Sequence, residues 1–325
     1  SVEDWAWDDL RLLERATKNR PIRLSSRSRP GARLAIDDNG VIGVLRTRAR
    51  YLRREPFDRA RLIKLGGIVA ICVAVGLFFV FGLPWLARPA ASLVPVAWED
   101  PVGESTIDLI NGIAADGRPM CQNAAGVAAL QKLTDRLSAN LDTPYRFTVT
   151  VADSGIVNAL AVPGGRIMLF RGLIKKAKSP DEVAGVLAHE MAHVVHRHPT
   201  QGMINSVGWS SLMSVFTGGA SLSNEAVARL AAHLATSAYS RDLETEADEG
   251  ALQILANAGI GNAGFANFFR LIERESGGGL GLPGYMSSHP QTKDRIAAIE
   301  NRPATSGTPA MTDAEWRVLR AICDR

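Results

Sequence analysis

Several features are scarce in this chain of 325 residues. It has only three cysteines and six histidines, and no internal repeat is visible along it. Charged residues make up 22% and hydrophobic residues 46%, which excludes the composition of a disordered chain. The length exceeds what one domain of typical size needs, so we expect a globular protein with more than one part.

An excess of basic charge is missing from most of the chain. Residues 1–64 hold 16 Lys and Arg against 9 Asp and Glu, whereas residues 88–325 hold 21 against 24. A nucleic-acid-binding surface needs a basic patch with interleaved aromatic residues. The front of the chain has arginines, but an adjacent apolar run explains them better, and we expect no nucleic-acid partner.

That run has no charged residue over 23 positions, Leu65 to Ala87, between Lys64 and Arg88. A helix that rises about 1.5 Å per residue crosses a hydrocarbon core of ~30 Å over this length. The alternative, a buried core helix, is usually shorter and amphipathic. The run therefore predicts one N-terminal transmembrane helix at 65–87.

Basic residues crowd in front of the run, and only Arg88 follows it before Arg118. The positive-inside rule therefore places residues 1–64 in the cytoplasm and residues 88–325 across the membrane. The same basic residues suit contact with anionic lipid headgroups. They are Arg46, Arg48, Arg50, Arg53, Arg54, Arg59, Arg61 and Lys64.

Composition also predicts the domain boundaries. In the first segment, "ARLAIDDNGVIGVLRTRARYL" predicts a strand, a turn and a short helix. Pro89, Pro95 and Pro101 favour a linker after the apolar run. The predicted parts are a small cytoplasmic module at 1–64, the transmembrane helix at 65–87, a linker at 88–104 and a larger domain at 105–325.

The larger domain mixes two periodicities. Helices are predicted at 122–140 and from Asn224 to Ala258, and strands in "YRFTVTVAD", "IVNALAV" and "RIMLF". The last two strands flank a Pro-Gly-Gly turn. These patterns predict a mainly helical α+β fold with a small sheet. Residues 202–222 are apolar but broken by Gly and Ser, and we expect a mobile segment near the functional site.

Four of the six histidines lie in "SPDEVAGVLAHEMAHVVHRHP", residues 179–199. Ser179 as N-cap, Pro180 at the first helical position and Glu182 three residues after the cap predict a helix that begins with a capping box. Pro199 predicts its end. The histidines are therefore expected on a well-defined helix.

His189, Glu190 and His193 form an H-E-x-x-H motif on this helix. Residues four apart project from one face, so both imidazoles can reach one zinc ion, which accepts nitrogen at roughly 2.0–2.1 Å. Glu190 is placed to accept a proton from water rather than to bind the metal. A third protein ligand is needed. His196 shares the face only approximately, and we interpret His198 as a cap or a surface residue.

A second stretch, "SRDLETEADEGA", offers carboxylates for the third position. Glu244 and Asp248 are four apart on a predicted helix, so one could bind the ion while the other accepts a histidine N–H. The alternative is a solvated acidic helix face, to which we assign Glu246 and Glu249. Spacing alone does not decide between Glu244 and Glu246.

Four elements in this order resemble the membrane-associated zinc metallopeptidases typified by the CAAX prenyl protease and the heat-shock protease HtpX. The chain is most similar to their periplasmic and mitochondrial inner-membrane members. The resemblance covers roughly residues 105–300. Its elements are "VNALAVPGGRIMLFRGLI", "SPDEVAGVLAHEMAHVVHRHP", "SRDLETEADEGA" with its glutamate-x-x-x-aspartate motif, and "SSHPQTKDRI".

The resemblance implies a role for each matching position. His189, His193 and Glu244 become the ligands of one Zn²⁺ per chain. Glu190 becomes the general base, and Asp248 becomes the partner that orients a ligand histidine. The domain at 105–325 becomes a zincin-like metallopeptidase domain.

Substrate contacts also follow from the resemblance. In relatives, the strand before Pro-Gly-Gly pairs with an extended substrate, which makes Asn158, Ala159, Leu160 and Ala161 candidate contacts. His289 becomes a second catalytic candidate that either stabilises the oxyanion or plugs the open position of the metal. A simple role at a helix start stays open for it.

A single span departs from the family's several transmembrane helices and favours a periplasmic domain anchored in the inner membrane. Cys121 and Cys323 are then candidates for a disulfide, with two unrelated thiols as the alternative. We predict a membrane-anchored zinc endopeptidase that acts on misfolded or exported proteins; an oligomer is compatible with it. The alternatives are a zinc-containing, chaperone-like assembly factor with low or latent activity, and hydrolysis of a small molecule.

Overall fold

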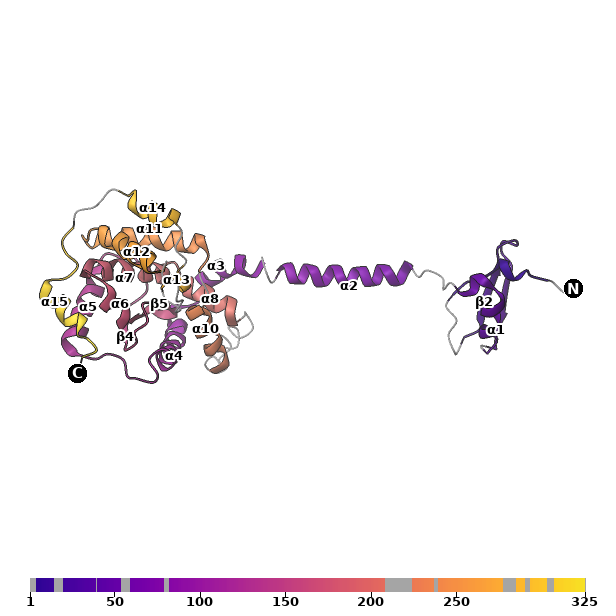
Figure 1. Ribbon diagram of the computed structural model, residues 1–325, viewed down its shortest axis with the longest axis horizontal. Coiled ribbons are helices and arrows are strands. Elements are labelled where there is room, and N and C mark those ends of the chain that lie inside the picture. The colour runs from indigo at the N-terminus through magenta and orange to yellow at the C-terminus, as the bar shows by residue number, and fades with distance from the viewer. Residues whose placement is uncertain are drawn as a thin grey trace. The chain divides into compact units, whose positions relative to one another are not determined.

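The structure, a computed structural model, describes ten stretches of the chain. The chain divides into two compact units, Ser1–Phe78 and Phe79–Arg325, which are described separately (Figure 1). The described residues are 4–14, 20–38, 40–53, 59–78, 82–207, 224–236, 239–276, 285–289, 293–302 and 307–324.

The first unit contains a small antiparallel sheet. Its strands β1 (Leu10–Leu12), β2 (Ile22–Ser26) and β3 (Arg33–Ile36) are ordered β1-β2-β3, and α1 (Val41–Arg48) and a 3₁₀ turn (Arg50–Arg53) follow. Alternate residues of β2 are buried in a core that α1 also joins, as expected for strands with one covered face. The strand and the helix predicted in this segment are confirmed.

The structure describes the apolar run predicted as a span at 65–87 only in part. Helix α2 (Arg59–Leu77) ends inside the predicted span at 65–87, and α3 (Leu83–Leu93) begins anew with Pro84 in its first turn. Proline lacks an N–H and therefore suits a helix start better than a helix interior. Residues 79–81 lie outside the described residues. In the part of the chain that the structure describes, no helix is long and apolar enough to cross a membrane.

Helices also replace the linker predicted at 88–104. Helix α3 runs to Leu93, and α4 (Val96–Ala114) begins directly after Pro95, which is its N-cap. Ala87, Ala91 and Val94 are buried in the core of the second unit. Pro95 thus marks a helix start, while Pro89 and Pro101 lie inside helices.

The second unit contains a three-stranded sheet of order β4-β6-β5. Strand β4 (Thr148–Ala152) is parallel to β6 (Arg166–Phe170), and β5 (Ala159–Val162) is antiparallel to β6. The three predicted strands are confirmed. Gly164 in the turn between β5 and β6 has φ +81°, and a Cβ there would lie 2.7 Å from the Cα of Asp100 in α4. Only glycine allows the turn to approach α4 so closely.

The two faces of this sheet enter different cores. Ile167 and Leu169 of β6 belong to a core shared with α5 (Ala124–Ser138) and α7 (Pro180–Val195). Met168 and Phe170 join residues of α4, α8 (His198–Val207) and α10 (Asn224–Thr236). This alternation follows from the two-residue period of a strand. The sheet therefore lies between two helical layers, which agrees with a mainly helical α+β fold.

Helix α7 is the centre of the second unit. Helices α11 (Arg241–Asn257) and α12 (Ala263–Ser276) make its most extensive contacts (Figure 1). Gly250 lets α11 come close, because a Cβ there would lie 2.8 Å from Cβ of Ala192. The Ser179 side chain caps α7 by accepting the N–H of Glu182. The Glu182 carboxylate accepts the N–H of Lys178 rather than that of Ser179, so the predicted reciprocal capping box is wrong in its second half.

Two predicted helix boundaries are also wrong. The helix expected from Asn224 to Ala258 consists of α10 (Asn224–Thr236) and α11, with Ser240 as a new N-cap. Pro199 does not end α7; it lies in the first turn of α8 (His198–Val207), because the chain already turns at Arg197, where φ is +57°. The remaining helices are α6 (Arg171–Lys176), α13 (Tyr285–Ser288), α14 (Lys293–Glu300) and α15 (Asp313–Arg320). Most of the segment predicted to be mobile, 208–222, lies outside the described residues.

Candidate metal centre

Helix α7 places two imidazoles side by side in the interior. His189 and His193 lie one turn apart, both fully buried, with 3.0 Å between their Nε2 atoms. Helix α11, packed against α7, brings the carboxylate of Glu244 to 3.5 Å from His189 Nε2 and 3.6 Å from His193 Nε2. Two helices therefore supply three donors to one point.

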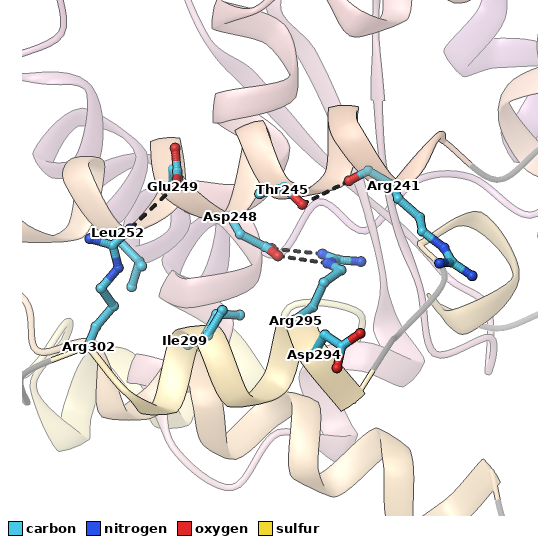
Figure 2. A pocket seen from close by; sticks show the side chains of 10 residues that line it. Arg241, Thr245, Asp248, Glu249, Leu252, Asp294, Arg295, Ile299 and Arg302 are labelled. Carbon is cyan, nitrogen blue, oxygen red and sulfur yellow. Dashed lines mark hydrogen bonds and ion pairs between the residues drawn. The ribbon is translucent and has the colours of Figure 1, made fainter.

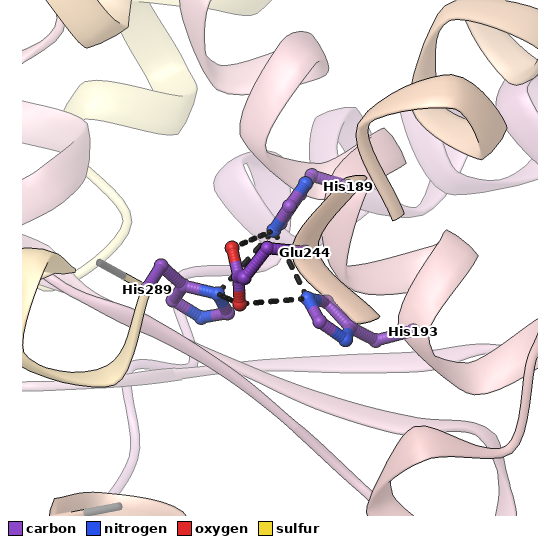
Figure 3. Close-up of side chains that lie close together, drawn as sticks. All are labelled: His189, His193, Glu244 and His289. Carbon is purple, nitrogen blue, oxygen red and sulfur yellow. Dashed lines mark hydrogen bonds and ion pairs between the residues drawn. The ribbon is translucent and has the colours of Figure 1, made fainter. Parts of the chain in front are cut away.

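A fourth donor comes from the residue after α13. His289 Nδ1 lies 3.3 Å from His189 Nε2 and 3.0 Å from Glu244 Oε1. Figure 3 shows the four side chains converging, and their ligand atoms all lie within 4.8 Å of one another. His289 is buried, so the cluster is closed toward solvent on this side.

These distances fit a zinc ion. In a tetrahedral site with bonds of roughly 2.0–2.1 Å, neighbouring ligand atoms lie about 3.3 Å apart. The five distances between donor atoms given above range from 3.0 to 3.6 Å. Two imidazoles with a carboxylate are also a chemically suitable donor set for zinc. The residues present therefore fit the metal.

Charge in the cluster points the same way. Burial alone lowers the pKa of His189, but hydrogen bonds with Asp248 and Glu244 outweigh it and raise that pKa to about 9. Burial raises the pKa of Glu244, but His289 and His189 outweigh it and hold that pKa well below its usual range. Ionised carboxylates in a dry interior need compensating positive charge, which Arg295 and His189 supply here and to which a divalent ion would add.

Comparison with known proteins identifies the family. Residues 125–303, more than half of the chain, match peptidase family M48. The chain belongs to peptidase family M48. The resemblance to membrane-associated zinc metallopeptidases is thereby confirmed, and the buried cluster of His189, His193 and Glu244 is its metal site.

Three M48 relatives show how far the similarity extends. The chain is 33% identical to the mitochondrial metalloendopeptidase OMA1 of Arabidopsis thaliana over 147 residues, which are 45% of this chain and 30% of that protein. It is 29% identical to the putative beta-barrel assembly-enhancing protease of Vibrio cholerae over 233 residues, 68% of this chain and 47% of the relative. It is 29% identical to the metalloprotease LoiP of Escherichia coli over 191 residues, which are 57% of this chain and 73% of that protein. The chain thus spans less than half the length of the first two.

Glu190 lies beside the M48 metal site and is fully buried. Oε1 of its carboxyl group lies 3.3 Å from Nε2 of His289, and the backbone N–H of Ala161 also faces the carboxyl group. Burial raises the pKa of Glu190, and the neighbouring histidines offset only part of the rise. A buried carboxyl group with a raised pKa beside a metal site is suited to accepting and returning a proton.

Asp248 is the partner of His189, and sequence reasoning missed what holds it in place. Its Oδ1 lies 3.1 Å from His189 Nδ1. Arg295, at the start of α14, donates two hydrogen bonds of 2.7 Å to Asp248, drawn in Figure 2, and its Nη1 lies 2.6 Å from Glu244 Oε2. A cavity of about 290 Å³ opens beside this pair. We call His189, Asp248 and Arg295 the inner arm.

The sequence interpretation of His198 and Glu246 is wrong. His198 is fully buried rather than a surface residue, and its Nδ1 lies 2.8 Å from Nδ1 of His193. Its Nε2 faces Glu246 at 3.3 Å, so Glu246 is not simply part of a solvated face. Burial lowers the pKa of His198 to about 4, which keeps its ring neutral. Glu249 is exposed and pairs with Arg302.

The candidate substrate residues lie at the edge of the sheet. Ala159, Leu160 and Ala161 belong to β5, the edge strand, and all three side chains are buried. Asn158 precedes the strand, and its side chain accepts the N–H of Ala159 and the hydroxyl of Ser288. The strand beside the metal site and the segment carrying His289 are therefore tied together.

Cys121 and Cys323 are joined by a disulfide in the structure. The disulfide fixes the segment after α15 to the segment before α5. The N–H of Cys121 also donates to the carbonyl oxygen of Val151, which attaches the same segment to β4. Cys72, the remaining cysteine, is free and exposed.

Proposed function

We propose that this M48 protein is a zinc-dependent endopeptidase that hydrolyses peptide bonds in misfolded or exported proteins. The observation that carries the proposal is the metal cluster with the fully buried Glu190 carboxyl group directly beside it. That combination supplies both parts needed for hydrolysis by an activated water molecule.

The residues divide the work. His189, His193 and Glu244 would hold one zinc ion, which when bound polarises a carbonyl group and acidifies water. Glu190 would take a proton from the attacking water and deliver it to the leaving amine nitrogen. Because burial raises its pKa, Glu190 is a stronger base than an exposed carboxylate.

Edge strand β5 supports an extended peptide as the substrate. An edge strand can pair with another extended chain through backbone hydrogen bonds, and such pairing depends little on side-chain sequence. Unfolded segments offer free backbone groups, whereas folded proteins do not. Asn158 to Ala161 are therefore the proposed substrate contacts.

The proposed location is an oxidising compartment next to a membrane. The disulfide supports the compartment, since disulfides are rare where thiols are kept reduced. In α2, the large apolar side chains from Ile63 to Leu77 are exposed, which supports contact with lipid. Flotation with liposomes tests this proposal, and a variant lacking residues 59–78 should no longer float.

His289 supports a second candidate function, a zinc-containing assembly factor with low or latent proteolytic activity. Its Nδ1 takes the fourth donor place, whereas a catalytic zinc site keeps one place for water or substrate. The same residue could instead stabilise the oxyanion once it moves aside.

Metal analysis paired with casein cleavage tests both candidates. An endopeptidase is expected to contain about one zinc per chain and to lose cleavage with a chelator. Glu190→Gln should keep its zinc and lose cleavage, whereas His289→Ala should cleave at least as fast as wild type if this residue restrains the site. Bound zinc without cleavage in wild type and in His289→Ala would favour the assembly factor.

A further inference from the structure

His198 and Glu246 connect a metal ligand with the protein surface. We propose that His198 is a positioning residue that orients His193, and that Glu246 and Arg88 of α3 hold His198 in turn. We call these four residues the outer arm. The proposal rests on the proposed function in one respect, because it takes His193 as a zinc ligand.

Geometry fixes the protons along the outer arm. Nε2 of His193 points into the donor cluster and must be free of hydrogen to bind a metal, so its Nδ1 carries the proton. That N–H can only donate to Nδ1 of His198, 2.8 Å away, which must then be the acceptor. A neutral imidazole with a free Nδ1 carries hydrogen on Nε2, and this atom faces Oε2 of Glu246 at 3.3 Å. The arm therefore has one consistent set of donors and acceptors.

The carboxylate of Glu246 is held on its outer side by Arg88 and His196. The guanidinium of Arg88 donates to both of its oxygens, and His196 Nδ1 lies 3.3 Å from Oε1. The ring of His198 also stacks on that of His196, with centroids 5.6 Å apart and planes at 21°. Glu246 cannot rotate away from His198 without losing these partners.

Helix α3 supports the outer arm at two points. Besides Arg88, it is attached through Ala91 and Val94, whose carbonyl oxygens accept hydrogen bonds of 2.7 and 2.6 Å from Arg197. Arg197 is adjacent to His198 in the chain, and its left-handed backbone aims the histidine back toward α7. The position of α3 therefore bears on the orientation of His193.

A simpler explanation is that His198 only fills space in the interior. The two explanations differ in what a substitution does to the metal. Loss of packing lowers stability but leaves an intact zinc site in every molecule that folds. Loss of positioning weakens zinc binding even in folded protein, by about 10–100-fold when a ligand's orienting partner is removed.

The experiment measures the zinc dissociation constant of the full chain by competition with a chromogenic chelator. His198→Phe keeps the ring volume but has no acceptor, and we expect it to weaken zinc binding about 10–100-fold. His198→Asn can still accept the His193 N–H through Oδ1 and should recover most of that loss. Glu246→Gln and Arg88→Ala should show progressively smaller losses. Glu249→Gln, on the same helix but outside the arm, should bind zinc as the wild type does.

Zinc affinity of folded His198→Phe within twofold of wild type would overturn the proposal, as would an equal loss in Glu249→Gln. Should His198→Phe not fold, Glu246→Gln decides: a zinc affinity equal to that of the wild type would reject the arm. A second measurement uses nitrogen-15 NMR of histidine rings in metal-free protein. His193 should carry its proton on Nδ1 in wild type and in His198→Asn. If wild type binds no zinc, the proposed function fails, while the ring spectra still test the arm.

Discussion

The inner arm and the outer arm hold two histidines of the same helix in different ways. In the inner arm, His189 faces the carboxylate of Asp248 directly, and the arginine behind it has a side chain only 5% exposed. In the outer arm, a second imidazole stands between His193 and its carboxylate, and the terminal Arg88 side chain is 60% exposed. One arm is closed inside the protein and the other reaches its surface.

Because of this difference, we expect His189 to be held rigidly and the orientation of His193 to be adjustable. Charges in the interior interact strongly, and a buried pair is costly to break once its partner is gone. An exposed pair is weakened by water and salt. The inner arm therefore fixes His189, whereas the orientation of His193 remains sensitive to α3.

Loss of the disulfide should cause the largest fall in the free energy of unfolding that we predict. This fall favours neither arm, so it is the reference for the selective effects below. Cys121 and Cys323 are 202 positions apart. The chain-entropy relation for such a loop gives about 5 kcal/mol of stabilisation. Replacing both by serine should lower the free energy of unfolding in urea by up to this amount. The substitution should lower the stability of the whole protein and leave the geometry of both arms unchanged. A change in the zinc affinity of the folded variant would contradict this expectation.

Arg295→Met should produce the largest selective effect. It leaves Asp248 and Glu244 without their buried cation, and breaking a buried pair typically costs about 3–5 kcal/mol. Urea unfolding measures this loss, and zinc affinity should fall with it. Arg302→Met is the matched control at an exposed residue just after α14, where the pair with Glu249 is worth at most about 1 kcal/mol. Similar losses in both variants would show that the inner arm is not special.

Local patterns predicted much of the site because they act within one element. The spacing of His189 and His193 places both rings on one face, and the structure has them 3.0 Å apart. The cap at Ser179 fixed where that helix begins. The Pro-Gly-Gly turn and its two strands were equally readable, since a strand's period and a turn's residues are local properties.

The rest of the site depends on tertiary contacts that no local pattern encodes. His198 is brought back to His193 by one left-handed residue, Arg197, and nothing in the surrounding residues marks that conformation. Arg295 lies on α14, whereas the two carboxylates that it holds lie on α11. One pattern in the sequence could have indicated an orienting histidine, namely the pair His196 and His198 directly after α7.

Salt concentration should change the stability contribution of the outer arm but not that of the inner arm. Arg88→Ala removes an exposed pair, so at low ionic strength it should lower the free energy of unfolding by at most about 1 kcal/mol. In 1 M sodium chloride, where the screening length is about 3 Å, the difference from wild type should vanish. The cost of Arg295→Met should persist in salt. A cost of Arg88→Ala that is independent of salt would mean that the outer arm is also shielded from solvent.

The smallest predicted effect concerns the ion pair of Lys132 and Glu315, neither of which is buried. Hydrogen bonds from Lys132, and then from Thr312, lower the pKa of Glu315 from 4.5 to about 2. Because the folded protein has the lower pKa, Glu315 contributes stability above pH 4.5 and loses it as the pH falls toward 2. Glu315→Gln should therefore be less stable than wild type at pH 7, by less than about 1 kcal/mol. The gap should narrow between pH 4.5 and 3 in urea unfolding, with Asp313→Asn on the same helix turn as the control. A gap that widens on acidification would reverse the sign and remove Glu315 from the comparison.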